Sequence, residues 1–187
     1  ILGVTTIGAV VGYLATSLVT SWVMGALTPK PDFGAMGAMG SQGILVNQKS
    51  PASPQDFVYG QVRKGGVITY YETTGTNNKF LHQVIAVAGH EVEEIGDIYI
   101  NDEVVTWNAS TGLVGGRWSD KIRIRKHLGN DTVADPDLQS ESQQINGDFV
   151  GRGIAYIYVR YEFDQDVFAN GLPLITTVVK GKKVFDP

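Results

Sequence analysis

The first 29 residues of this chain carry no charged side chain, and this run limits what the chain can fold into more than any other feature. The first charge, Lys30, stands in Pro29-Lys30-Pro31-Asp32, where the prolines end any helix. A bilayer core needs about 20 apolar residues in helical form, so the run is long enough to cross one. We predict an apolar helix over residues 1–28, followed by a Gly- and Pro-rich linker over residues 29–50.

At helical spacing this predicted helix has one bulky face and one nearly smooth face. Gly8, Gly12, Thr16 and Thr20 lie on the smooth face, and the two glycines form a G-x-x-x-G motif. Small residues at this spacing let a second helix approach closely. The run alone favours a lone membrane anchor, while its many small residues also suit a helix buried between copies of the chain in an oligomer.

After residue 44 the pattern changes to alternation of β-branched and aromatic residues with polar ones, which is typical of strands. Gly65-Gly66 predicts a tight hairpin between the first two strands, and Asn101-Asp102 predicts another turn, with residues 103–105 returning. The predicted strands span residues 57–63, 67–73, 80–88, 92–100, 121–126, 154–163 and 174–180.

So many short strands predict a mainly β domain over residues 51–187, an antiparallel sandwich or barrel built from hairpins. With the N-terminal helix the chain is α+β overall. Residues 129–153 lose the apolar alternation and predict a long loop that contacts a partner. We expect the domain to be truncated at Pro187, as the ordered or excised part of a longer protein.

Composition and motifs argue against several classes of function. The net charge of −4 is unlike that of proteins held to nucleic acid by phosphate contacts, and the absence of cysteine excludes thiolate chemistry. His82, His90 and His127 lack zinc-site spacing, so we expect surface or interface positions for them. Ser41 lacks the first glycine of G-x-S-x-G, and no phosphate-binding glycine motif is present. We predict no catalytic residue, no metal and no cofactor.

Acidic residues cluster in three places, and solvated loops are their default interpretation. Carboxylate pairs also serve glycoside hydrolysis or calcium binding, so a glycosidase stays open as a third hypothesis. These acids are Glu91, Glu93, Glu94 and Asp97; Asp131, Asp135 and Asp137; and Asp164 and Asp166.

Three cations, Lys121, Arg123 and Arg125, alternate with Ile122 and Ile124, which places them on one face of a strand. That face either meets solvent or makes an electrostatic contact with an acidic stretch, such as residues 91–97, of a neighbouring subunit.

Stretches that span nearly the whole chain resemble one family, the tail-tip hub or tip attachment (host-specificity, J-like) proteins of long-tailed bacteriophages, in their N-terminal region. None of the matching residues is catalytic. The stretches are residues 29–34, 50–51, 57–60, 65–68, 72–73, 80–92, 151–160, 164–168, 170–173 and 178–187.

The resemblance implies a virion structural protein with no enzymatic activity, which closes the tail tube as a homo-oligomer, commonly a trimer. Implied partners are the distal tail protein, the tape measure protein and other tail-tip proteins, and DNA passes through without specific binding. The apolar helix either stays inside the tip or enters the host membrane at ejection. The alternative is a membrane-anchored bacterial protein with an extracytoplasmic β domain.

Overall fold

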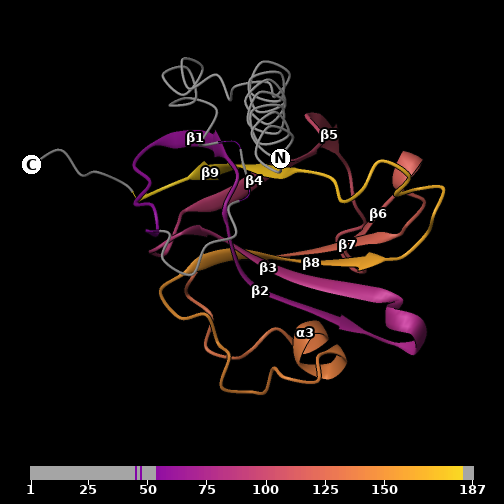
Figure 1. Ribbon diagram of the computed structural model, residues 1–187. Coiled ribbons are helices and arrows are strands. Elements are labelled where there is room, and N and C mark those ends of the chain that lie inside the picture. The colour runs from indigo at the N-terminus through magenta and orange to yellow at the C-terminus, as the bar shows by residue number, and fades with distance from the viewer. Residues whose placement is uncertain (1–44, 46, 48–53, 183–187) are drawn as a thin grey trace, which may run out of the picture. The chain divides into compact units, whose positions relative to one another are not determined.

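A computed structural model of the chain describes residues 45, 47 and 54–182 (Figure 1). The predicted helix over residues 1–28 and nearly all of the linker over residues 29–50 lie outside this part. The described strands form two antiparallel sheets, which confirms the prediction of a mainly β domain.

The two sheets form two layers of the domain (Figure 1). One is four-stranded, in the order β1 (Gln61–Lys64), β9 (Ile175–Lys180), β4 (Glu94–Ile100) and β5 (Glu103–Val105). The other is five-stranded, in the order β2 (Val67–Thr74), β3 (Phe80–Ala88), β8 (Ala155–Glu162), β7 (Ile122–His127) and β6 (Leu113–Val114). Two short 3-10 turns, η3 (Thr76–Asn78) and η4 (Gly116–Trp118), lie between strands.

The main core fills the space between the sheets. Along β7, Ile122 and Ile124 point inward and are buried, as the alternation predicted. Ile157 and Val159 of β8 belong to the same cluster, and Ile98 of β4 faces them from the other sheet. Strand alternation thus produces one apolar face on each sheet, and burial of these two faces against each other stabilises the sandwich.

The predicted hairpin at Gly65-Gly66 is wrong, because β1 pairs with β9 and β2 pairs with β3. The glycines mark the point where the chain leaves one sheet for the other. Gly66 lies so close to β3 that an added Cβ would stand 2.4 Å from the carbonyl oxygen of Ala86. By contrast, the turn at Asn101-Asp102 is confirmed: β4 and β5 pair, and both residues have positive φ.

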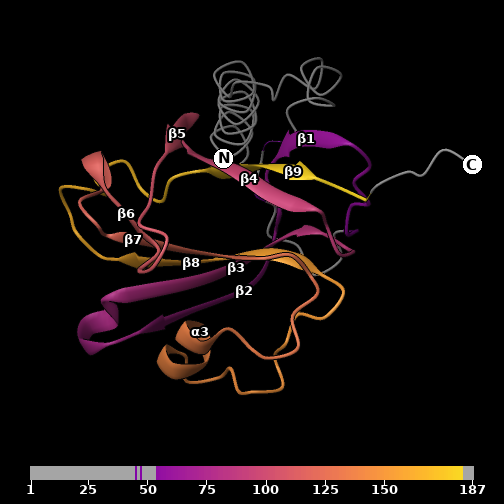
Figure 2. The ribbon, with the colours of Figure 1, turned by 180° about the vertical axis from the view of Figure 1, so that it is seen from behind.

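Residues 129–153, which we call the strap, connect β7 to β8. Where the sequence predicts a long loop, the structure has one short helix, α3 (Pro136–Glu141), between β7 and β8. α3 lies beside the five-stranded sheet, on the side away from the four-stranded sheet (Figure 2). The five-stranded sheet is therefore covered on both faces.

Candidate functional site

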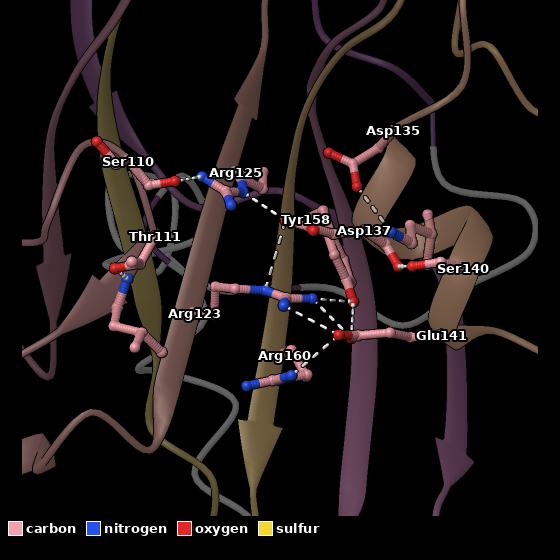
Figure 3. A network of polar contacts seen from close by, with 12 residues as sticks. Ser110, Thr111, Arg123, Arg125, Asp135, Asp137, Ser140, Glu141, Tyr158 and Arg160 are labelled. Carbon is pink, nitrogen blue, oxygen red and sulfur yellow. Dashed lines mark hydrogen bonds and ion pairs between the residues drawn. The ribbon is translucent and has the colours of Figure 1, made fainter.

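Charged and aromatic side chains gather where the strap meets the outer face of the five-stranded sheet (Figure 3). The helix in the strap begins at Asp135, whose carboxylate accepts a hydrogen bond from the Leu138 amide at 2.7 Å. Pro136 follows at the first helical position, where its missing amide hydrogen costs nothing. The fully buried Leu138 packs against Val84, Tyr156 and Tyr158.

Strand alternation sets the sheet side of this site. Arg123 and Arg125 of β7 point away from the core, and their cross-strand partners on β8 are Arg160 and Tyr158. His127 is paired in the same way with Tyr156. Two arginines directly opposite each other repel, so this face needs a carboxylate between them.

Glu141, at the end of α3, supplies that carboxylate. Its Oε1 accepts hydrogen bonds from Arg123 at 3.0 Å and Arg160 at 3.1 Å, and its Oε2 accepts one from Arg123 at 2.6 Å. Burial acts to lower the pKa of Arg123, but its bonds with Glu141 and Tyr158 outweigh burial and raise that pKa. We call Arg123, Arg160 and Tyr158 the arginine clamp.

A second ion pair lies one step further along β7. The Arg125 Nε donates to Asp137 Oδ2 at 2.7 Å, and its Nη1 donates to the Ser110 carbonyl oxygen at 3.1 Å (Figure 3). Arg125 therefore ties the strap to the chain just before β6.

His127 forms the third contact between strap and sheet. Its Nδ1 lies 3.1 Å from Asp131 and its Nε2 lies 2.7 Å from Asp135, while its ring stacks on Tyr156 at 4.3 Å. Burial acts to lower the pKa of His127, but the hydrogen bonds to Asp135 and Asp131 raise it. Burial acts to raise the pKa of Asp135, and the bonds from His127 and the Leu138 amide lower it.

At Glu72 of β2 the carboxylate belongs to the sheet, whereas in the three contacts above it belongs to the strap. It accepts hydrogen bonds from the Ser142 hydroxyl at 2.6 Å, the Gln143 amide at 3.2 Å and the Tyr70 hydroxyl at 2.7 Å. These bonds lower the pKa of Glu72 against the opposing effect of burial. The strap is thus held to β2, β7 and β8 at once.

The histidine prediction is wrong for His82, which is fully buried between Thr74 Oγ1 at 2.7 Å and the Tyr158 hydroxyl at 2.8 Å. Burial lowers its pKa. His90 matches the expectation better: it is half-buried and its Nε2 accepts from the Val58 amide at 2.8 Å.

Arg123 and Arg125 lie on one face of β7, as the alternation predicts. At Arg123 this face does not meet solvent, because the exposed fraction of the residue is only 9%. Lys121 pairs with Glu162 of its own chain at 3.0 Å, and Arg123 and Arg125 pair with the strap. The inter-subunit contact of these three cations stays a prediction. Gly8, Gly12, Thr16 and Thr20 lie outside the described residues.

The default of solvated loops is wrong for Asp135, which is buried. Sequence reasoning also missed Glu72, Glu141, Tyr158 and Arg160 as members of one network. A usable signal was present: Tyr156, Tyr158 and Arg160 alternate along their strand as the cations do along theirs, and Asp135-Pro136 is typical of a helix start.

Chemically, this arrangement neutralises charge. Each carboxylate in it is held by a cation or by several hydrogen bonds. Within residues 54–182 no three His, Asp or Glu side chains converge on a point where a metal ion would fit. Among the described residues, no helix has the length and apolar character needed to cross a membrane.

A separate pocket of about 300 Å³ opens at the end of β8. Apolar and aromatic side chains dominate its lining, and Lys79 is the one charged residue there. No carboxylate or imidazole lines it, so the pocket lacks a group of the kind that transfers protons near neutral pH.

No family model and no curated protein matches the chain. A chain of the solved structure "Virion of native gene transfer agent (GTA) particle" is similar over 81% of this chain, at 17% sequence identity and a TM-score of 0.46. The match spans 39% of that longer chain. A likeness this distant carries no argument about function.

Proposed function

We propose that this chain is a structural protein of a phage-like particle, the hub of a tail tip. In this role it closes the tail tube and links it to receptor-binding parts during host attachment and DNA ejection. It catalyses no reaction. The sequence stretches that resemble tip attachment proteins lead to this proposal, and most of them fall in the two-sheet domain described above.

One structural observation supports the proposal: the carboxylates that the strap brings to the sheet are each paired with a cation or histidine of the sheet. Glu141 and Asp137 are fixed by arginines, and Asp135 is fixed by His127. A glycosidase needs one protonated and one ionised carboxyl group on either side of an open substrate site. These acids instead lie on the strap and pair with side chains of β7, which favours a passive role.

The proposal extends to assembly. We propose a homo-oligomer, a trimer, in which the predicted helices over residues 1–28 bury their small faces against one another or against the tape measure protein, beneath the distal tail protein. The net charge of −4 discourages adhesion of DNA passing through. Lys121, Arg123 and Arg125 remain the proposed electrostatic contact between subunits.

The test is to locate the full chain in purified particles. An antibody to the chain, with gold-labelled electron microscopy, should mark one end of the tail, and mass spectrometry should find the chain in particles at a fixed ratio to the tail-tube protein. Particles assembled without the chain should lack a closed tip.

The uncharged run over residues 1–29 favours a second candidate, a membrane-anchored bacterial protein with an extracytoplasmic β domain. The same experiment separates the two. Recovery of the chain from cell envelopes, and never from particles, would overturn the tail-tip proposal and support the anchor.

A further inference from the structure

The strap is attached to the sheet by the ion pairs described above and by one small apolar cluster, to which it contributes Leu138, Ile145 and Phe149. Of its residues only Gly129, Ala134, Asp135 and Leu138 are buried. α3 has six residues, too few for a helix to be stable alone. Segments with few buried apolar contacts open locally at low free energy, without unfolding of the rest of the protein.

On the sheet side of the contact, the strand register sets which residues face each other. Arg123 and Arg160 lie on neighbouring strands whose ladder holds them opposite each other. The ring of Tyr158 is buried, and its hydroxyl is hydrogen-bonded to His82. The backbone positions of the arginine clamp are therefore set by the sheet and not by the strap.

The clamp also has unused capacity to donate hydrogen bonds. The Nε atoms of Arg123 and Arg160 are buried and make no hydrogen bond among the described residues, although the Arg123 Nε lies 3.8 Å from Asp137 Oδ2. Two facing arginines with spare donors form a site for an anion, and planar carboxylates suit guanidinium groups best.

We propose that the outer face of the five-stranded sheet is a binding site for an acidic segment of a partner protein, and that the strap occupies this site as an internal ligand. The strap shows the chemistry of the partner: carboxylates equivalent to Asp135, Asp137 and Glu141, with an apolar side chain equivalent to Leu138. Because the strap is tethered, its effective concentration is high, and a partner must compete with it. This inference does not rest on the proposed tail-tip function.

The experiment measures binding of a synthetic peptide, with the sequence of residues 133–144 and a fluorescent label, to the full chain by anisotropy. Two proteins are compared: the wild-type chain and the Glu141→Gln variant, in which the internal ligand has lost its charge. We expect the peptide to bind the variant at least about tenfold more tightly, a difference of about 1.4 kcal/mol. A peptide that itself carries Glu141→Gln should lose this advantage.

Two further variants make the test specific. Adding Arg160→Gln to the Glu141→Gln protein should abolish binding, whereas adding Lys121→Gln, on the same face but outside the clamp, should leave it unchanged. Equal affinity for the two peptides, equal affinity of the two proteins, or no binding to the Glu141→Gln protein would each overturn the proposal.

A second measurement serves if Glu141→Gln does not fold. In Glu141→Ala, added sodium formate should fill the emptied clamp and raise the melting temperature in a saturable way, compared with sodium chloride at equal ionic strength. Wild-type protein should show no such difference. Equal effects of the two salts on Glu141→Ala would contradict a carboxylate site.

Discussion

The two faces of the five-stranded sheet are held in different ways. On the inner face, Ile124 and Ile157 pack against the other sheet with no directional requirement. On the outer face, Arg123 and Arg160 meet the strap through bonds that need matched charges and short distances. The same strands thus present a core that tolerates exchange of similar apolar residues and a network in which each member depends on its partner.

The largest expected effect comes from emptying part of the inner face. Ile157→Ala removes buried methyl groups from a side chain that is 1% exposed, so we expect a loss of about 2–5 kcal/mol in the free energy of unfolding. Urea denaturation followed by circular dichroism measures it. Val104→Ala is the control, because this side chain is 56% exposed and should change stability by less than about 0.5 kcal/mol. Similar losses for the two variants would contradict this description of the core.

The next effect comes from the outer face. Glu141→Gln keeps the size of the side chain but removes the carboxylate that Arg123 and Arg160 share, and we expect a loss of about 1–3 kcal/mol. The same urea titration applies. Double substitution with Arg160→Gln should recover part of the loss, because the repulsion disappears. Strictly additive losses would show that the two groups act independently.

The inner face could be predicted from the sequence, and the outer network could not. Alternation identified most of the strands, although it missed β6, and only the end of the predicted range 57–63 belongs to β1. It also placed Ile122 and Ile124 inward, because period two is a local property. The pairing of Glu141 with Arg123 and Arg160 depends on the path of the strap, which no local pattern determines. The failed hairpin at Gly65-Gly66 has the same cause: a local turn signal does not say which sheet the next strand joins.

The contact between His127 and the strap predicts how stability depends on pH. The pKa of His127 is raised on folding, so its contribution is complete below the unfolded pKa and is lost as pH rises through the folded pKa. The pKa of Asp135 is lowered, so its contribution is lost as pH falls through its folded pKa. The stabilisation from this ion pair should therefore be greatest above the unfolded pKa of Asp135 and below the unfolded pKa of His127.

Asp135→Asn separates charge from capping. Asparagine caps a helix as well as aspartate does, so α3 should persist while His127 loses an ion-pair partner. In urea titrations over a pH series, the fall in stability on the alkaline side should be smaller in the variant. If the free energy of unfolding falls equally in the variant and the wild type as pH rises, the ion pair with Asp135 does not cause that fall.

The smallest effect is expected at an ion pair outside both faces. Arg117 and Glu103 lie 3.0 Å apart with both side chains more than half exposed. Glu103→Gln should change the free energy of unfolding by less than about 0.5 kcal/mol, because water screens the pair. A loss as large as that of Glu141→Gln would remove the distinction between exposed and covered charges.

Native-state hydrogen exchange on the full chain tests most directly whether the two faces are independent. We predict that the strap amides of Ser142 and Ile145 exchange through a local opening, and that Glu141→Gln accelerates them while the β8 amides of Ile157 and Val159 follow only the change in global stability. Equal acceleration in the strap and in β8 would mean that strap and sheets unfold as one unit, and would contradict the account.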